Sequence, residues 1–552
     1  MDGSGLDPGR TLATMAVGEC HMRLATSLVI AMTSATLHGD PVEISIDGAF
    51  QDWGGVPIAW QDATGDASAD IDMTSLWIAN DDRFLFLRLE ATEEFDLSEN
   101  NNLKFYLDTD NDASTGLAIG GIGAELEWRA GERIGTFFHD DDSTVVYHDA
   151  IRFRGIPTIT STQFEMCFGR NMNPDETNPL FPGQTVRLLI KDGDNGDQVP
   201  DAGDVIEYTF DPDTGPGPDI ISLVRDDPKI VRMITHNVKT DRITDNQYED
   251  SFERMYVAVD ADILHLQEIY ESTADDIEQL IEDWLGGNWY SASVNDCKTI
   301  SRFPIQDAWA IDGNLAVLID TSDALGTPVL CINAHLPCCS NDEGRQAESD
   351  AIMAFIRDAY LPGGNVFLGP EVPVMIAGDL NLVGLARQLE TLVTGDIQDE
   401  DTYGPDQEPD PDGTNLTNII SRLTEKRMGY TWRNDFSSFW PGHLDYLIYS
   451  DSNMSLRKDF ILYTPEMSQN SLDAYGLDFW DSTASDHLVF CADFAAPCFG
   501  DITNDGNVDV NDLLIMLADW ETTDPDSDIN DDGLVDADDI LALLSSWGSC
   551  GS

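Results

Sequence analysis

Short runs in which apolar and polar residues alternate fill the chain from residue 41 to about 212. Examples are "SLWIAN", "LKFYLD" and "VRLLIKD", and Gly, Asp and Asn turns separate such runs. Successive side chains of a strand point to opposite faces, so this period of two indicates half-buried strands. We therefore predict an antiparallel β-sandwich over residues 40–212.

A different pattern follows a Pro- and Gly-rich stretch at 213–227, which we interpret as a linker. From 228 to 496, apolar runs such as "PVLCINAHL" alternate with helical patterns such as "RQAESDAIMAFIRDAY". Strands with intervening helices predict a layered α/β domain whose sheets are buried between helices. A multidomain protein also suits the chain length of 552 residues.

The last segment, 498–552, contains one unit twice, beginning at Asp501 and again at Asp528. In each copy, oxygen-bearing side chains occupy positions 1, 3, 5, 9 and 12 around a glycine at position 6, which is the spacing of a calcium loop. An amphipathic stretch follows each loop, so we predict a small α domain of two loop–helix units. The predicted Ca²⁺ ligands are Asp501, Thr503, Asp505, Asp509 and Asp512, then Asp528, Asn530, Asp532, Asp536 and Asp539.

The N-terminus has the features of an export signal. Arg23 precedes an apolar run from Leu24 to Met32, and small residues follow before Asp40. We predict a leader over residues 1–39 with translation starting at Met22, and hence a secreted or cell-surface protein without a transmembrane segment. The alternative is a cytoplasmic protein with an unstructured N-terminus.

Export would permit disulfides among the nine cysteines. Cys498 and Cys550 bracket the last segment and suggest a disulfide. Cys338 and Cys339 are adjacent, with Cys297 as a candidate partner, although connectivity cannot be read from sequence.

Acidic residues dominate the charge. Lys and Arg number 29 against 102 Asp and Glu, a formal net charge of -73. Such a charge opposes non-specific attraction to nucleic acid or anionic membranes, and it suits an extracellular or high-salt environment or the binding of hard cations.

Polar residues end several apolar runs of the middle segment. Asp379 and Asn381, for example, close "PVMIAGDLN". A layered α/β domain brings strand ends to one rim, so we expect these side chains to meet. Carboxylates, amides and imidazoles together suit one divalent cation and an acid/base pair, although a turn cap or a structural histidine would explain any one of them alone. The set is Asn237, Glu268, His335, Asp379, Asn381, Asp445, Asp486 and His487.

Seven motifs carry a family resemblance between about 230 and 494. In order they are "THNV", "LQE", "SRFPI", "NAHL", "GDLN", "LDY" and "SDH". This series resembles the endonuclease/exonuclease/phosphatase superfamily, which includes deoxyribonucleases, sphingomyelinases and inositol polyphosphate phosphatases. The resemblance implies a four-layer α/β sandwich and a metal-dependent phosphoric ester hydrolase.

The same resemblance implies roles for the polar set. Glu268 would be the principal Mg²⁺ or Mn²⁺ ligand, with Asn237 beside it and Asp486 completing the metal region. Asp379 and Asn381 would orient water and hold a phosphoryl oxygen. His487 would be the base, or the stabiliser of the attacking water, and Asp445 its orienting carboxylate. His335 would contact the phosphate and help to protonate the leaving oxygen.

Substrate recognition is less defined by the sequence. Arg302, Trp432 and Arg433 are candidate substrate contacts, but a core tryptophan and structural arginines explain them equally well. His443 stands where the family often has arginine, which is a departure near the substrate. The acidic domain lacks the basic groove of a duplex-binding nuclease.

We therefore predict phosphodiester hydrolysis, with nucleic acid as one substrate class. The alternative substrate is a phospholipid or a soluble phosphate ester. A hypothesis of another class is a non-catalytic surface or matrix-binding protein.

The two outer segments carry resemblances of their own. The tail is similar to dockerin domains, whose loops end in Asp as at Asp512 and Asp539, and this implies a cohesin-like or cell-surface partner. "ISIDGAFQDWGG" and "FYLDTDNDASTG" resemble family 9 carbohydrate-binding modules, which implies a polysaccharide partner. Two turns of this segment are either further calcium sites or solvated acidic turns. Their residues are Asp108, Asp110 and Asp112, and Asp192, Asp194 and Asp197.

Overall fold

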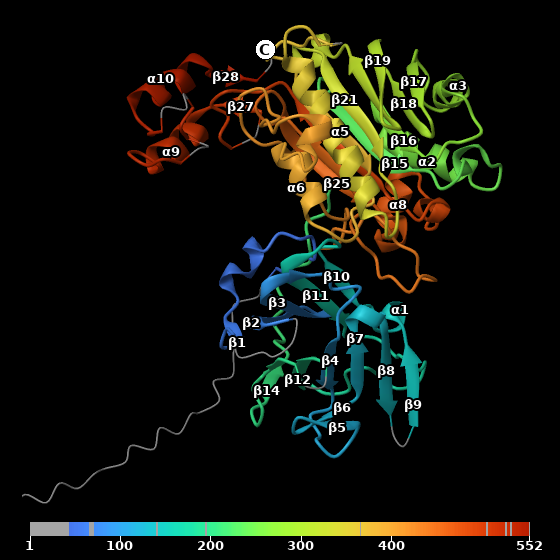
Figure 1. The fold of residues 1–552 in the computed structure, drawn as a ribbon, viewed down its shortest axis with the longest axis vertical. Helices are drawn as coiled ribbons and strands as arrows, with labels where there is room; N and C mark the ends of the chain where they lie inside the picture. Colours follow the sequence, from blue (N-terminus) through green and yellow to red (C-terminus); the bar gives the residue numbers. More distant parts are fainter. Residues whose placement is uncertain are drawn as a thin grey trace, which may run out of the picture. The chain divides into compact units, whose positions relative to one another are not determined.

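The computed structural model describes residues 43–65, 71–139, 142–193, 196–364, 366–503, 506–524, 527–529 and 533–550 (Figure 1). The predicted leader therefore lies outside the described residues, as do Asp194, Asp505, Asn530 and Asp532. Among the described helices, none is both long and apolar enough to cross a bilayer.

Two antiparallel sheets form the N-terminal segment, which confirms the predicted sandwich. Leu87 and Phe164 of the first sheet share one buried core with Phe105 and Leu188 of the second. The first sheet has the order β1 (Ile58–Gln61), β2 (Met73–Asn80), β3 (Phe84–Phe95), β11 (Ser161–Gly169), β10 (Arg154–Ile156). The second has the order β13 (Gln198–Val199), β12 (Thr185–Asp192), β4 (Leu103–Asp108), β7 (Leu126–Arg129), β8 (Ile134–His139), β9 (Asp142–Val146), and β14 (Ile206–Thr209) also pairs with β12. A hairpin, β5 (Leu117–Ile119) with β6 (Ile122–Ala124), and the short helix α1 (His148–Ile151) complete the segment.

Two six-stranded mixed sheets form the middle segment, as the alternation of strands and helices predicts. The first has the order β17 (Tyr290–Val294), β18 (Cys297–Ser301), β16 (Ile263–Gln267), β15 (Val231–Asn237), β26 (Val489–Ala495), β25 (Ser455–Leu462). The second has the order β19 (Ile305–Ile311), β20 (Asn314–Ile319), β21 (Val329–His335), β22 (Val374–Asp379), β24 (Asp445–Tyr449), β23 (Thr417–Asn418). The pairs β15–β16 and β21–β22 are parallel, and the others are antiparallel.

Burial on both faces explains why these strands read as continuous apolar runs. Met233 of β15 lies in the core between the sheets with Cys331 and Met375, whereas its neighbour Ile234 faces the helices on the outer side. The middle segment is thus layered helix–sheet–sheet–helix (Figure 1). On the first sheet pack α2 (Glu249–Val259), α3 (Ala274–Leu285) and α8 (Gln469–Tyr475), and on the second α5 (Asp342–Tyr360) and α6 (Arg387–Thr394). Two single turns, α4 (Ser322–Leu325) and α7 (Glu400–Tyr403), lie in connections.

A buried ion pair joins two neighbouring strands of the first sheet. Arg232 on β15 donates from Nε and Nη2 to the carboxylate of Asp493 on β26 over 2.6 and 2.7 Å. Its Nη1 donates to the carbonyls of Leu223 and Val259, so residue 223 of the predicted linker is packed against the domain.

The substitution Asp493→Asn should destabilise the protein strongly. It leaves the buried Arg232 guanidinium without a counter-charge, which costs about 3–5 kcal/mol in the free energy of unfolding. Urea denaturation measures this cost. The matched control is Asp226→Asn, which removes an exposed partner of Lys458 and should cost less than about 1 kcal/mol. Equal effects of the two substitutions on the free energy of unfolding would contradict a buried Arg232–Asp493 ion pair.

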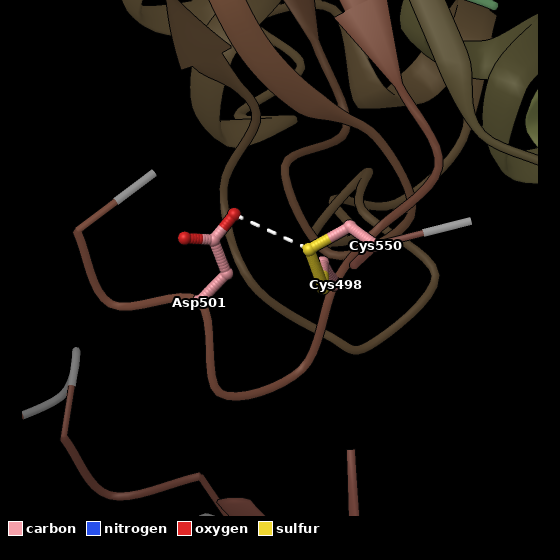
Figure 2. Close-up of side chains that lie close together, drawn as sticks. All are labelled: Cys498, Asp501 and Cys550. Carbon is pink, nitrogen blue, oxygen red and sulfur yellow. Dashed lines mark hydrogen bonds between the residues drawn. A yellow bond between two sulfur atoms is a disulfide. The ribbon is translucent and has the colours of Figure 1, made fainter. Parts of the chain in front are cut away.

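The tail contains α9 (Val510–Ala518) and α10 (Ala537–Ser545), with a small sheet of β27 (Asn507–Val508) and β28 (Gly548–Ser549). A disulfide joins Cys498 to Cys550, which confirms the predicted pairing (Figure 2). Cys550 Sγ also lies 3.4 Å from Asp501 Oδ2. Because both sulfurs are in the disulfide, neither is available as a thiolate ligand beside Asp501.

The suggested pairing of Cys297 with Cys338 or Cys339 is wrong, since Cys297 is buried on β18 and unbonded.

Candidate active site

Strand ends from both sheets of the middle segment meet at one edge. The parallel pairs bring the ends of β15 and β16, and of β21 and β22, to this edge, where they place Asn237, Glu268, His335 and Asp379. β24 and β26 run antiparallel to their neighbours, so their beginnings lie at the same edge. The structure therefore brings together all eight residues of the polar set.

Asn237 links the two sheets through its side-chain amide. Its Nδ2 donates to Glu268 Oε1 over 3.0 Å and to Asp379 Oδ2 over 2.9 Å. Both imidazoles approach the same Asp379 oxygen, since the Nε2 atoms of His335 and His487 each lie 3.6 Å from it. Asp379 Oδ2 is therefore the common point of the constellation.

His487 is held by the buried carboxylate of Asp445. Nδ1 lies 3.1 and 2.9 Å from the two carboxylate oxygens of Asp445. This contact fixes the proton on Nδ1 and turns Nε2 toward Asp379. Burial alone would lower the pKa of His487, but the carboxylates of Asp445 and Asp379 outweigh burial and raise it.

His335 has a carboxylate partner that the strand-end pattern does not contain. Its Nδ1 lies 2.6 Å from Asp296 Oδ2, and the same oxygen accepts a hydrogen bond from the backbone N–H of Glu268. Burial lowers the pKa of His335, but the hydrogen bond to Asp296 and the charge of Asp379 raise it to about 9. Without a bound cation, these carboxylates therefore favour the protonated imidazole of His335.

A loop of unusual backbone conformation encloses Glu268. Lys239, Thr240 and Asp241 all have φ between 52° and 59°, and Glu268 itself has φ 62°. Thr240 donates from its N–H and its hydroxyl to Glu268 Oε2, while Lys239 Nζ lies 2.7 Å from Asp486 Oδ2. Left-handed backbone at non-glycine residues costs about 1–3 kcal/mol each and concentrates at functional sites. Nothing in the sequence pattern points to Lys239 or Thr240.

The donor set fits a hard divalent cation. Glu268, Asp379 and Asp486 supply carboxylates and Asn237 an amide, which are the oxygen ligands that Mg²⁺ and Mn²⁺ prefer. Asp379, Asp445 and His487 also place ligand atoms within 4.8 Å of one another, but Asp445 and His487 are already bonded together. The family resemblance assigns the ion to Glu268, Asn237 and Asp486. Asn237 Oδ1 accepts the Lys239 N–H, and Asp486 Oδ2 pairs with Lys239 Nζ, so an ion at this place would have to replace these contacts.

The three candidate substrate contacts lie in different places. Trp432 is half-buried and its backbone pairs with that of His487, beside the site. Arg433 donates its backbone N–H to the Asp486 carbonyl, but its guanidinium is bound to Asp435 and to the Tyr430 hydroxyl. Arg302 pairs with Asp260 and Asp262 at the opposite end of β16, so the structure does not bring it to the site.

The N-terminal sandwich contacts the segments that lead to the site. Trp440 donates from Nε1 to the Gly155 carbonyl over 2.9 Å and packs in the sandwich core against Phe153. The Thr158 hydroxyl lies 3.0 Å from the Leu382 carbonyl and 2.9 Å from the His443 carbonyl. These contacts reach the chain next to Asn381 and two residues before Asp445, which the resemblance of the sandwich to carbohydrate-binding modules does not anticipate.

If His487 is the base, the substitution Trp440→Ala should lower kcat by about 10- to 100-fold, because a small displacement of the chain before Asp445 also displaces the imidazole that Asp445 holds. Hydrolysis of a chromogenic phosphodiester at a temperature well below unfolding measures the effect. The control is Leu76→Ala, a buried residue of the same core on β2. A comparable loss of kcat in the control would mean that sandwich stability alone is responsible.

One comparison with known protein families matches the middle segment. Residues 234–487 match the Endonuclease/Exonuclease/phosphatase family, and this range includes all eight residues of the polar set. The middle segment is therefore an endonuclease/exonuclease/phosphatase domain. A search of curated proteins finds no match to the chain.

Several solved structures are similar to about half of the chain. The 2′,3′-cyclic phosphatase ANGEL2 is 15% identical, with a TM-score of 0.32, and the alignment covers 48% of this chain and 96% of that one. An endonuclease/exonuclease/phosphatase from Bacteroides vulgatus is 14% identical, with a TM-score of 0.33 and coverage of 49% and 99%. TDP2 from D. rerio, solved with a single-strand DNA product, is 13% identical, with a TM-score of 0.32 and coverage of 48% and 98%.

Proposed function

We propose that the protein is a divalent-metal-dependent phosphodiesterase that cleaves a P–O bond by in-line attack of water. One observation carries the proposal. Asp445 holds His487 so that its Nε2 faces Asp379, and the Asn237 amide donates to both Asp379 and Glu268. The candidate base, the candidate water-orienting carboxylate and the candidate cation ligand Glu268 thus lie within one set of hydrogen bonds and close charged contacts.

Each residue has a task in this reaction. Nε2 of His487 takes the proton of the attacking water, and Asp445 stabilises the resulting imidazolium. Asp379 orients that water, and its position is fixed by Asn237 and by the Asn381 N–H, which donates to Asp379 Oδ1 over 3.1 Å. His335, protonated and held by Asp296, donates to a phosphate oxygen or to the leaving oxygen.

Glu268, Asn237 and Asp486 would hold Mg²⁺ or Mn²⁺. When bound, the ion supplies charge stabilisation for the phosphoryl oxygens and offsets the carboxylates that raise the pKa of His487. Lys239 Nζ lies 2.7 Å from Asp486 Oδ2 and balances its negative charge.

An assay on several esters tests the proposal. The purified protein is given bis(p-nitrophenyl) phosphate, DNA, RNA and sphingomyelin, each with Mg²⁺ and with EDTA. We expect hydrolysis of at least one diester that EDTA abolishes. Cleavage of sphingomyelin alone would favour the phospholipid alternative, and no hydrolysis of any ester would favour a non-catalytic binding protein.

We also propose that the protein is secreted and that its tail binds Ca²⁺. The Cys498–Cys550 disulfide supports an oxidising compartment. The two repeats share local geometry, since Gly506 and Gly533 have φ of 85° and 88° and donate to the carboxylates of Asp501 and Asp528. The capping boxes Asp509–Asp512 and Asp536–Asp539 begin α9 and α10 in the same way.

Calcium should therefore stabilise the tail. We expect Ca²⁺ to slow proteolytic cleavage between residues 498 and 552, because the ion offsets the repulsion among the loop carboxylates. The substitution Asp512→Ala should abolish this protection for the first loop, with Asn511→Ala as the control. Unchanged protection in Asp512→Ala would contradict the ligand assignment. The resemblance of the tail to dockerin domains is the basis for proposing a cohesin-like or cell-surface partner.

The sandwich offers one cluster that suits Ca²⁺. Carboxylate oxygens of Asp108, Asp110 and Glu125 lie within 4.8 Å of one another, and burial raises the pKa of Glu125 to about 7. Asp112 instead accepts hydrogen bonds from Ser114. Asp192 and Asp197 accept from the backbone N–H groups of Ile71 and Met73, so they fasten the chain before β2. A polysaccharide partner for this segment rests on its resemblance to carbohydrate-binding modules.

A further inference from the structure

Two adjacent cysteines lie just beyond the end of the strand that carries His335. Cys338 and Cys339 are both exposed, and their sulfur atoms are 2.6 Å apart. This distance is longer than the roughly 2.05 Å of a disulfide bond but too short to admit another group between the sulfurs. Cys339 has φ 65°, so the turn already presents the two thiols to each other.

The other unpaired cysteines of the described residues cannot react in the same way. Cys167, Cys297, Cys331 and Cys491 are buried, and burial raises the pKa of each thiol. Reactive cysteines are accessible and form thiolate, whereas buried apolar ones are inert. A soluble disulfide should therefore react by thiol–disulfide exchange with Cys338 and Cys339 rather than with the four buried cysteines.

The backbone before and within the pair is bound to segments beside the candidate active site. Arg345 donates from Nη1 to the carbonyls of Pro337 and Cys339, and from Nη2 to the carbonyl of Val383. Asn381 Nδ2 donates to the Leu336 carbonyl over 3.0 Å, and the Leu336 N–H donates to the Asp379 carbonyl. Leu336, between His335 and the pair, thus connects this turn to the loop that carries Asp379 and Asn381.

We propose that Cys338 and Cys339 form a vicinal dithiol that a low-molecular-weight disulfide oxidises, and that closure of the eight-membered ring displaces His335. One thiolate attacks a sulfur of the small disulfide, which gives a mixed disulfide and releases one thiol. The second thiolate then attacks the protein sulfur of the mixed disulfide and releases the second thiol. Both cysteine protons pass to the two released thiols, so the pair loses two electrons and the small disulfide gains them.

Either thiol can begin the exchange, since both sulfurs lie exposed at the same turn. The Cys338→Ser protein should accumulate the mixed disulfide at Cys339, and the Cys339→Ser protein should accumulate it at Cys338, because each lacks the second thiol that resolves it.

Mass spectrometry of the full chain treated with glutathione disulfide tests the site. After alkylation and digestion, the peptide with both cysteines should be lighter by two hydrogen atoms and carry neither glutathione nor the alkylating group. The same digest reports whether Cys498–Cys550 stays intact. Stable glutathione adducts on the unmutated pair, or no modification at all, would overturn the proposal.

The effect on the site has its own readouts. The link to catalysis rests on the proposed function, and we expect oxidation to slow diester hydrolysis by about 10-fold or more, since small displacements of a catalytic group have such effects. The Cys338→Ser/Cys339→Ser protein should not respond to glutathione disulfide, and Cys297→Ser should respond like the wild type. An unchanged rate after complete closure would overturn the coupling.

A second readout separates this proposal from the proposed function. The imidazole NMR signal of His335, assigned with His335→Asn, should shift on ring closure whether or not the protein hydrolyses a diester. If no ester is cleaved but the signal shifts, the proposed function fails and the dithiol site stands. A signal that does not move on closure would overturn the displacement of His335.

Discussion

Replacing Asp445 with asparagine should lower kcat for a phosphodiester by about 10²–10⁴-fold, the range that a positioned general base contributes. The amide presents N–H or carbonyl oxygen to Nδ1 of His487, so it no longer fixes the tautomer that leaves Nε2 free to accept a proton. The introduced amide also carries no charge to stabilise the imidazolium. The side chain is almost isosteric, so KM and the free energy of unfolding should change little by comparison.

Steady-state hydrolysis of bis(p-nitrophenyl) phosphate at saturating Mg²⁺ measures this effect. The matched control is Asp478→Asn, an exposed carboxylate near Arg254 that lies outside the polar set. We expect the control to retain wild-type kcat. A kcat for Asp445→Asn within twofold of the wild type would exclude His487 as a base oriented by this carboxylate.

The second large effect is expected from Glu268→Gln. This substitution removes the charge that should contribute most to holding the cation, while it keeps the side-chain length. Mutation of a residue that only hydrogen-bonds to a metal ligand typically lowers metal affinity by about 10- to 100-fold. Loss of a charged ligand itself should therefore weaken Mg²⁺ binding by about 10²-fold or more. Activity should fall in parallel and recover in part at high Mg²⁺.

Isothermal titration of the protein with Mg²⁺ measures that affinity without reference to turnover. Ca²⁺ is added beforehand to fill the Ca²⁺ sites proposed for the tail, so that the response reports on the middle domain. Glu271→Gln, an exposed carboxylate three residues further on, is the control and should bind Mg²⁺ as the wild type does. Unchanged Mg²⁺ affinity in Glu268→Gln would show that the cation is held elsewhere.

The strand-end residues of the site could be anticipated from sequence because their position follows from topology. A polar residue that closes an apolar run must lie at a strand end, and the parallel pairs β15–β16 and β21–β22 bring those ends to one edge. The disulfide between Cys498 and Cys550 could also be anticipated, since the two cysteines bracket a short segment of its own composition.

Residues that reach the site through loops could not be anticipated in this way. Asp296 lies in the turn between β17 and β18, and it meets His335 only because two sheets pack face to face. Thr240 reaches Glu268 through consecutive left-handed residues, a conformation that no hydrophobic pattern encodes. Arg302 is the opposite case, since the sequence suggests it as a substrate contact and the structure places it away from the site. It follows β18, which runs antiparallel to β16, so its side chain lies at the far end of the sheet.

The contact between the sandwich and the middle domain also could not be predicted from the sequence. Trp440 looks like one more core tryptophan of its own domain, and only the three-dimensional structure reveals that it packs with Phe153 of the sandwich. The sequence therefore predicts the domains and most of the candidate site, while the supports of that site depend on tertiary contacts.

The most direct test of the central claim is the initial rate of bis(p-nitrophenyl) phosphate hydrolysis by the wild-type protein and by His487→Ala, each with Mg²⁺ and with EDTA. The account predicts hydrolysis by the wild type with Mg²⁺, and a rate in His487→Ala that is lower by about 10²-fold or more. EDTA should reduce the wild-type rate to background. An undiminished rate in His487→Ala, or a wild-type rate that EDTA leaves unchanged, would contradict metal- and histidine-assisted attack of water.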